Sequence, residues 1–264
     1  LGSLTYDIDL DAARAAGVVV CWWPVATVIR VAEHIVMQMQ VLSKKLRQSE
    51  AIALEASAEW GESRRTDEDT FAYNWSHRTC VEGLWQTTVG IIGFGEIGVE
   101  VARRLQGWDV TLLYNKKTRL PETVETELGL AYVDAETLFK ESDFVVNLLP
   151  YFAQTDMMIG AEQFERMKDG AFFVSCGSGS VIDETALAAS VESGKLGGSA
   201  LDTFEWEPIR PDNPLIPLAK SMHNVLLTPH IAAGAASASD KERQGDYSNI
   251  VRFIAGEPLR HRVA

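Results

Sequence analysis

A glycine-rich hexapeptide between an apolar run and an amphipathic segment constrains the fold of this chain more than any other feature. Its residues are, in order, Gly93, Phe94, Gly95, Glu96, Ile97 and Gly98. A strand-like run, 89–92, precedes it, and a helical pattern over 99–105 follows it. A GxGxxG sequence at a strand-to-helix junction is the fingerprint of a dinucleotide-binding βαβ unit. We therefore predict a nicotinamide dinucleotide site on a Rossmann domain.

Each glycine has a physical task in such a unit. Gly93 permits the tight turn, Gly95 lets the backbone approach a pyrophosphate, and Gly98 lets the helix pack closely on the strand. The anion then lies at the helix N-terminus, where unpaired N–H groups and the helix dipole favour negative charge. The alternative, glycines in an ordinary βα turn, is less consistent with the strand and helix patterns on either side.

The rest of the chain alternates between strand and helix patterns. Apolar runs predict strands at 89–93, 110–114, 144–149, 171–174, 199–201 and 225–227. Helical patterns lie between them, with Asp134 and Asp183 as N-caps for helices at 135–140 and 184–191. This alternation predicts an α/β fold with a doubly wound parallel sheet.

The segments before the glycine loop have a different pattern. We expect a helix at 11–16 that ends at Gly17, a strand at 18–21, and a long amphipathic helix from about residue 27. The apolar stripe of that helix consists of Val28, Val31, Ile35, Met39, Leu42 and Leu46. Residues 50–85 are polar and irregular and predict a connection anchored by Trp60, Trp75 and Trp85. A last helix is expected at 236–254.

Composition narrows the classes of partner and site. The net charge of −13, from 37 acidic and 24 basic residues, argues against nucleic acid as a partner. The sequence has no apolar run long enough to span a bilayer. Three widely spaced cysteines favour a reducing compartment, so we expect a cytoplasmic protein with no metal site.

The residues after the second predicted strand bear on the choice of cofactor. Asn115 stands where an NAD-preferring site carries Asp or Glu, and Lys116, Lys117 and Arg119 follow. A 2′-phosphate would be repelled by a carboxylate and attracted by these cations. The pattern favours NADP over NAD, and a charged, solvated loop is the alternative.

Several segments together resemble the D-isomer-specific 2-hydroxyacid dehydrogenase family. The matching segments are 31–34 (VAEH), 142–145 (SDFV) with Pro150, 202–208 (DTFEWEP) and 228–230 (TPH). Segments 104–108 and 195–198 add some likeness to the family's phosphite dehydrogenase branch. The resemblance covers nearly the whole chain.

The resemblance implies two domains. Residues 25–229 are expected to form the dinucleotide-binding domain, while 1–24 and 230–264 resemble parts of the family's flavodoxin-like substrate lobe. The sequence opens at Leu1 already close to a βα unit, so we expect only a remnant of that lobe, with its upstream part absent. Family members usually pair through the long helix, which implies a homodimer.

The resemblance also implies roles for particular residues. His230 matches the general acid/base and Glu207 the residue that orients it, with Glu205 as an alternative partner. An imidazole can take a hydroxyl proton as hydride leaves and return it in the reverse direction. Asp202 resembles the contact to the nicotinamide carboxamide, although it could equally be a strand-end turn carboxylate.

Leu149, Pro150 and Cys176 are expected to line the nicotinamide site.

The chain also departs from the family pattern. Ser178 stands where the family has a substrate-binding Arg, Ser175 where it has Asn, and Leu148 where His is common. Loss of a guanidinium that grips the substrate carboxylate removes transition-state stabilisation, on the order of 10² to 10³ in rate. A substrate without a carboxylate, held by Ser178, would explain the departure. Arg30 could instead substitute for the missing cation.

The main hypothesis is an NAD(P)-dependent oxidoreductase acting on a small hydroxy or oxo substrate with atypical anchoring. The alternative is a catalytically altered, cofactor-binding sensor or interaction protein on the same fold. The retained pair of His230 and Glu207 favours the enzyme.

Overall fold

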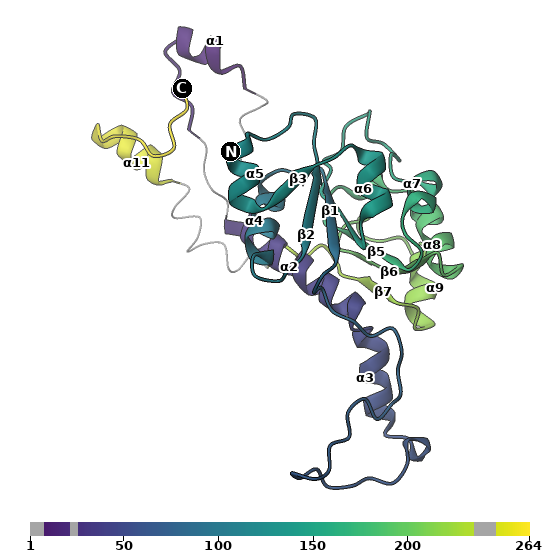
Figure 1. Ribbon diagram of the computed structural model, residues 1–264. Helices are drawn as coiled ribbons and strands as arrows, with labels where there is room; N and C mark the ends of the chain where they lie inside the picture. Colours follow the sequence, from purple (N-terminus) through teal and green to yellow (C-terminus); the bar gives the residue numbers. More distant parts are fainter. Residues whose placement is uncertain (1–7, 22–25, 235–246) are drawn as a thin grey trace.

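Seven strands form one sheet in which every neighbouring pair is parallel (Figure 1). The computed structural model describes residues 8–21, 26–234 and 247–264. The order of the strands across the sheet is β3-β2-β1-β4-β5-β6-β7. Their bounds are β1 Thr88–Ile92, β2 Thr111–Asn115, β3 Leu130–Tyr132, β4 Phe144–Asn147, β5 Ala171–Ser175, β6 Leu196–Leu201 and β7 Val225–Leu227. The predicted α/β fold with a parallel sheet is confirmed, and β3 is a strand that the sequence patterns missed.

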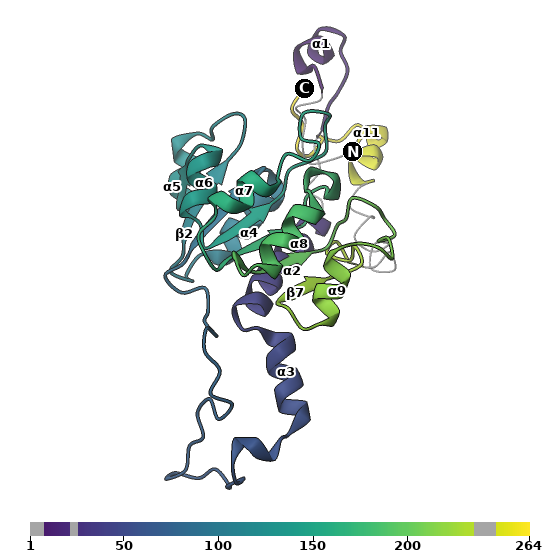
Figure 2. The same cartoon turned by 90° about the vertical axis from the view of Figure 1, so that its right-hand side faces the viewer.

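Helices cover both faces of this sheet (Figures 1 and 2). One face packs against α2 (Ala26–Ser43), α4 (Glu96–Leu105) and α5 (Glu122–Leu128). The other packs against α6 (Ala135–Glu141), α7 (Ala161–Arg166), α8 (Glu184–Glu192) and α9 (Leu215–Lys220). The strand order reverses between β1 and β4. In open α/β sheets, ligands bind in the crevice at the carboxyl ends of the strands beside such a reversal.

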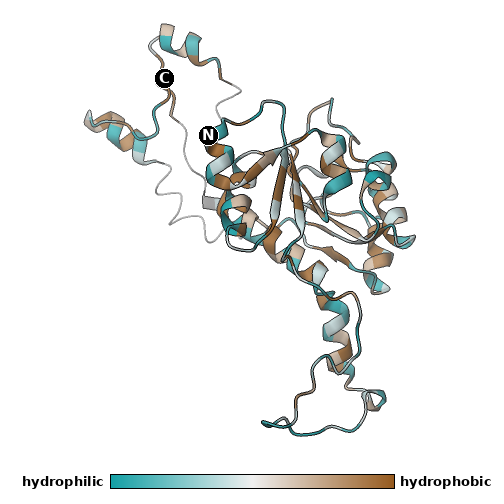
Figure 3. Ribbon diagram, viewed as in Figure 1, coloured by the Kyte–Doolittle hydropathy of each residue, from teal (hydrophilic) through white to brown (hydrophobic). Residues whose placement is uncertain are grey.

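The core has two parts because successive side chains of a strand point to opposite faces. In β4, Phe144 and Val146 belong to the cluster under α2 and α4, while Val145 belongs to the cluster under α6 and α8. Figure 3 shows the apolar strands between more polar outer helix surfaces. A strand buried on both faces reads as a continuous apolar run, which is why the central strands were predictable.

Helix α2 lies on the sheet with the predicted stripe turned inward. Ile35, Met39 and Leu42 are fully buried, and Val31 packs against the same cluster. The stripe ends earlier than predicted, because Lys45 has a positive φ of 45° and breaks the helix. Leu46, beyond the break, is 51% exposed and begins α3.

The segment 46–86, which we call the arm, extends away from the sheet (Figures 1 and 2). It begins with α3 (Leu46–Glu55), so residues 50–55 are helical rather than irregular as predicted. A short 3-10 turn, η1, covers Ala58–Trp60. The prediction of tryptophan anchors is wrong for Trp75 and Trp85, which are 42% and 67% exposed, while Trp60 is half-buried. The rings of Trp60 and Trp75 pack edge to face, with centroids 6.0 Å apart.

The two described ends of the chain lie together, apart from the sheet (Figure 1). Helix α1 (Leu10–Ala15) is capped by Asp9, and Arg14 donates to the carbonyl of Val263 at 2.8 Å. The predicted strand at 18–21 is wrong: this segment pairs with the C-terminal residues through one isolated bridge, Cys21 to Arg262. A single bridge is too short to make a strand.

The C-terminal helix α11 (Ser248–Ala255) follows a segment outside the described residues. The predicted helix at 236–254 is therefore confirmed only in its last part, since 236–246 lie outside the described residues. The domain boundaries at residues 25 and 229 stay a prediction. Among the described helices, none is long and apolar enough to cross a membrane.

Candidate active site

The glycine loop joins β1 to α4 at the carboxyl edge of the sheet. Gly93 has a φ of +82°, and a Cβ there would lie 2.6 Å from the backbone N of Leu149, so no other residue fits. Around Gly95, in contrast, the nearest atom to an added Cβ is 4.0 Å away. The first N–H groups of a helix have no partner further up the helix. The loop therefore offers open space directly at the donors of α4, as an approaching pyrophosphate requires.

The other loop residues differ in how they could serve a nucleotide. The ring of Phe94 is buried against the ring of Tyr114, with centroids 4.9 Å apart. The backbone N–H of Phe94 donates to the carbonyl of Asn115. An added Cβ on Gly98 would lie 2.8 Å from the Phe94 ring, so this glycine packs on Phe94 rather than on the strand as predicted. Ile97 packs against the core. Burial raises the pKa of Glu96, in the first turn of α4.

Asn115, which precedes the predicted cations, lies beside the glycine loop. Its carbonyl accepts from the N–H groups of Gly93 and Phe94, and its Nδ2 donates to the carbonyl of Val133 at 2.8 Å. Arg119 instead donates twice to Glu125. Asn115, at the end of β2, thus lies at the carboxyl edge of the sheet. Arg119 is paired with an acid that the sequence analysis did not single out.

A buried amide organises the predicted nicotinamide side. Asn147, at the end of β4, accepts from the N–H of Leu149 and donates to Ser175 Oγ, both at 3.1 Å. Its carbonyl accepts from the N–H groups of Cys176 and Gly177. The loops after β4 and β5, which carry Leu149, Pro150 and Cys176, are thus held side by side. Ser175, where the family has Asn, is the acceptor of this bond.

Burial keeps Cys176 a neutral thiol. Desolvation raises the pKa of Cys176, and the nearby charge of Asp202 raises it further. Its Sγ donates to Oε1 of Gln38, on α2, at 3.3 Å. Leu148, where the family commonly has His, is buried in the core beneath this loop.

His230 and Glu207 form a direct pair. His230 Nδ1 lies 2.6 Å from Glu207 Oε2, and Glu207 Oε1 accepts from the backbone N–H of Phe204 at 3.1 Å. A carboxylate accepts only, so the bond places the proton of the neutral ring on Nδ1 and leaves Nε2 as the base. The imidazole is 57% exposed. His230 is thus paired with Glu207, while the backbone N–H of the alternative partner, Glu205, donates to Glu184 Oε1 at 3.1 Å.

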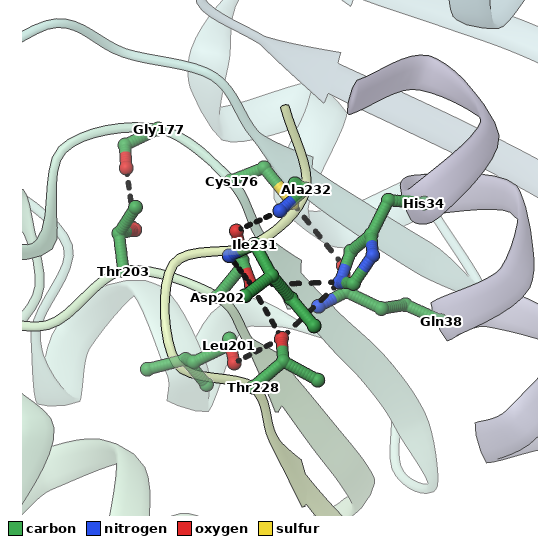
Figure 4. A network of polar contacts seen from close by, with 10 residues as sticks. All are labelled: His34, Gln38, Cys176, Gly177, Leu201, Asp202, Thr203, Thr228, Ile231 and Ala232. Atoms are coloured by element: carbon green, nitrogen blue, oxygen red, sulfur yellow. Dashed lines mark hydrogen bonds and ion pairs between the residues drawn. The ribbon is translucent and has the colours of Figure 1, made fainter. Parts of the chain in front are cut away.

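Asp202 fixes the loop that carries His230 (Figure 4). Its buried carboxylate accepts from Thr228 Oγ1 at 2.6 Å and from the N–H groups of Ile231 and Ala232 at 3.0 and 2.8 Å. These residues lie on both sides of His230. In this structure the carboxylate of Asp202, which was predicted to contact the cofactor, holds the backbone around His230 in place. We call the Asp202 carboxylate the loop latch.

Ser178 lies on the segment after β5, which packs on the segment that carries Glu207. Thr203 Oγ1 donates to the carbonyl of Gly177 at 2.5 Å, and the N–H of Ser178 donates to Leu149. A Cβ on Gly179 would lie 2.0 Å from the carbonyl carbon of Phe204, so only glycine allows this approach. Ser178, Glu207 and His230 thus follow three adjacent strands, β5, β6 and β7, at one edge of the sheet.

The comparisons with known proteins agree with this geometry. Residues 57–232 match the family model described as "D-isomer specific 2-hydroxyacid dehydrogenase, NAD binding domain". The chain belongs to this family. The domain described by that model indicates a nicotinamide cofactor. The likeness to the phosphite dehydrogenase branch stays a prediction.

Individual relatives of the chain are named as a dehydrogenase and a reductase. The chain is 33% identical to a D-3-phosphoglycerate dehydrogenase of Archaeoglobus fulgidus over 97% of this chain and 45% of that protein. It is 41% identical to a glyoxylate reductase of Korarchaeum cryptofilum over 66% of this chain and 51% of that protein. The chain therefore spans about half the length of these curated relatives.

Solved structures give the same fold. A formate dehydrogenase from Granulicella matches with a TM-score of 0.73 and 27% identity, over all of this chain and 66% of that one. A Pyrococcus horikoshii protein matches with a TM-score of 0.76 and 30% identity, over 99% of this chain and 74% of that one.

Proposed function

We propose that this protein is an NAD(P)-dependent oxidoreductase that transfers hydride between the nicotinamide and a small hydroxy or oxo substrate. The observation that carries the proposal is the 2.6 Å pair of His230 and Glu207 at the carboxyl edge of the sheet that also holds the glycine loop. The curated relatives described above are named dehydrogenases or reductases. Both points favour an enzyme over the alternative of a catalytically altered sensor.

His230 would move the proton. With Nδ1–H held by Glu207, Nε2 can accept the proton of a substrate hydroxyl, and the protonated ring can return it to an alkoxide in the reverse direction. The bound nicotinamide supplies or accepts the hydride. Glu207 stabilises the charged ring and fixes its orientation, because its second oxygen is held by the backbone of Phe204.

Ser178 would anchor the substrate. Its hydroxyl makes no hydrogen bond within the described residues and can offer one neutral hydrogen bond to an oxygen of the substrate. A substrate without a carboxylate best suits such a site. Arg30 is the competing anchor, since its guanidinium lies beside Gly234, four positions after His230, where an added Cβ would be 3.0 Å from Arg30 Nη1.

NADP is the cofactor that the ribose end favours. Asn115 provides no carboxylate to repel a 2′-phosphate, and Lys116 and Lys117 form no ion pair within the described part of the chain. The open space at Gly95 accommodates the pyrophosphate common to NAD and NADP. A homodimer and a cytoplasmic location complete the proposal; the exposed apolar side chains of the arm support the first.

The decisive experiment follows NADPH and NADH oxidation by the 264-residue chain with a panel of 2-oxo acids and neutral ketones. We expect turnover, and we expect His230→Gln to lower kcat by about 10² to 10⁴ while cofactor binding persists. Tight cofactor binding without turnover on any substrate, with His230→Gln indistinguishable from wild type, would establish the sensor instead.

Ser178→Arg serves as the matched test of anchoring. If Ser178 occupies the substrate end of the site, the new guanidinium should raise kcat/KM for 2-oxo acids relative to neutral ketones. An unchanged ratio would assign the anchor to another residue, and Arg30→Gln, measured on the same panel, would then identify Arg30 by loss of 2-oxo acid turnover.

A further inference from the structure

A carboxylate on α5 forms an ion pair with Arg119, the arginine of the loop after Asn115. Arg119 Nε donates to Glu125 Oε1 at 2.8 Å, and Arg119 Nη2 donates to Oε2 at 2.7 Å. Tyr114 also donates to Glu125 Oε1, at 2.5 Å, and accepts from the N–H of Leu120 at 2.8 Å. We call the side chains of Tyr114, Arg119 and Glu125 the acid clamp.

The carboxylate of the acid clamp is ionised and buried, and the tyrosine that donates to it is neutral. Glu125 is 6% exposed, and Tyr114 is fully buried. The hydrogen bonds from Arg119, the larger effect, and from Tyr114 lower the pKa of Glu125 to about 2. At neutral pH the guanidinium is therefore matched by a full negative charge. Arg119 also lies over the ring of Tyr132, 5.7 Å from its centroid, which holds it toward β3.

The position of the acid clamp connects it to cofactor choice. Asn115 pairs with Ile92 in the sheet register and accepts from the first N–H groups of the glycine loop, so it borders the nucleotide site. Arg119 is on the same loop. The loop offers three cations, of which Lys116 and Lys117 have no ion pair within the described residues and Arg119 has one. A fixed carboxylate thus removes the cation best suited to grip a phosphate.

We propose that Glu125 sets the cofactor preference by holding Arg119 away from the 2′-phosphate of NADP. The inference rests on the proposed placement of the adenosine ribose beside Asn115. Glu125 and the phosphate compete for the same fork of N–H donors, because the carboxylate already uses two of them. The site therefore discriminates less strongly in favour of NADP than its three cations would allow.

The test is the ratio of the Kd values for NADP and NAD, measured by titration of the full chain with each nucleotide. Glu125→Gln removes the charge and retains the shape of the side chain. We expect it to tighten NADP binding relative to NAD by about tenfold, the factor that one charge-assisted hydrogen bond is commonly worth. Arg119→Gln in the wild-type background should change the ratio less than about twofold.

The double variant decides the mechanism. Arg119→Gln should abolish the gain produced by Glu125→Gln, because the released guanidinium is the group that binds the phosphate. Glu122→Gln is the matched control, since it removes an exposed acid from the first turn of the same helix. An equal gain from Glu122→Gln, or a gain that survives loss of Arg119, would overturn the proposal in favour of a general charge effect.

Two further readouts separate other failures. Retained NAD affinity would show that the Glu125→Gln variant folds. If that variant does not fold, Glu125→Asp replaces it in the test. Glu125→Asp shortens the carboxylate side chain and should give a smaller gain in NADP affinity relative to NAD. Asn115→Asp tests the ribose placement itself and should shift preference toward NAD. If it does not, the placement is wrong; if it does and Glu125→Gln leaves the ratio unchanged, the acid clamp alone is refuted.

Discussion

The imidazole of His34 lies between α2 and the loop that carries His230. Its Nε2 is 3.1 Å from Thr228 Oγ1 and 3.6 Å from Asp202 Oδ1. Thr228 has one hydroxyl proton, which it donates to Asp202, so the threonine oxygen accepts from His34 Nε2–H. A directed chain of hydrogen bonds thus runs from α2 through Thr228 to the loop latch.

This histidine should make stability depend on pH. Burial, the dominant effect, lowers the pKa of His34, and Asp202 opposes the shift. Between the ordinary value of 6.5 and the lowered folded value, the unfolded chain binds a proton that the folded chain does not. The contribution of neutral His34 is therefore present above pH 6.5 and is lost as the pH falls through the folded pKa.

We predict that the free energy of unfolding of the wild type falls more steeply between pH 7.5 and 5 than that of His34→Gln. The excess slope is at most about 1.4 kcal/mol per pH unit for one proton. Urea denaturation at several pH values measures it. His77→Gln, which removes an exposed imidazole, should keep the wild-type slope; parallel curves for wild type and His34→Gln would contradict the argument.

Sequence motifs identified some site residues and missed others for a physical reason. His230 and Glu207 were found because each sits in a local motif, and the structure joins them by a hydrogen bond. His34 lies in the matching segment 31–34, but its contact with Thr228, 194 positions away, has no local signal. Glu125 is marked by no local pattern, because it acts through the buried Tyr114 and the loop of Arg119. Arg119 was predicted to be available for a phosphate, but its pairing with Glu125 depends on how α5 packs.

Elements at the sheet edge meet by unusually close contacts. The turn η2 (Gly179–Val181) approaches the backbone of Phe204 so closely that no side chain fits at Gly179. Thr203 ties the same two loops through its bond to Gly177. These contacts set the spacing between the segment of Ser178 and the segment of Glu207.

We predict that Gly179→Ala lowers the free energy of unfolding by about 1 to 3 kcal/mol, as overpacking does. It should also reduce kcat more than it weakens cofactor binding, because the clash lies between the substrate-side loops. Urea denaturation and nucleotide titration measure the two effects. Gly83→Ala, where an added Cβ meets only Lys44 Nζ at 4.0 Å, is the control. Equal behaviour of the two variants would refute this account.

Patterns predicted the elements well where burial was continuous and poorly where it was not. The core strands β1, β4 and β5 read as apolar runs because both of their faces are covered. Strand β3 was missed because it has three residues, of which Ala131 and Tyr132 are exposed. The arm was misread because its polar composition concealed α3, and because Trp75 and Trp85 are exposed rather than buried.

At the scale of the whole molecule, the arm exposes several large apolar side chains, although Leu84 near its end is buried in the core. Leu54, Phe71, Tyr73 and Trp85 are 78%, 85%, 83% and 67% exposed. Exposed large apolar side chains, when they gather on one surface, commonly mark an interface. The arm projects from the sheet domain in both orthogonal views (Figures 1 and 2), so a second copy could contact it without covering the glycine loop.

We predict that the chain is a homodimer in solution and that Phe71→Ser combined with Tyr73→Ser shifts it to the monomer. Light scattering after size-exclusion chromatography measures the mass, and nucleotide titration checks that cofactor binding persists. Phe253→Ser, on α11 and 67% exposed, is a control outside the arm and should leave the dimer intact. A wild-type monomer, or a dimer that withstands both arm substitutions, would contradict this prediction.

The order of the strands separates two tasks along the sheet. The residues proposed to recognise the cofactor phosphate follow β2, near one edge, while those proposed for proton transfer and substrate binding follow β5, β6 and β7, toward the other. Distant sites that share no partners contribute additively. Cofactor choice and substrate range could therefore diverge separately in evolution, and an engineer could exchange one without redesigning the other.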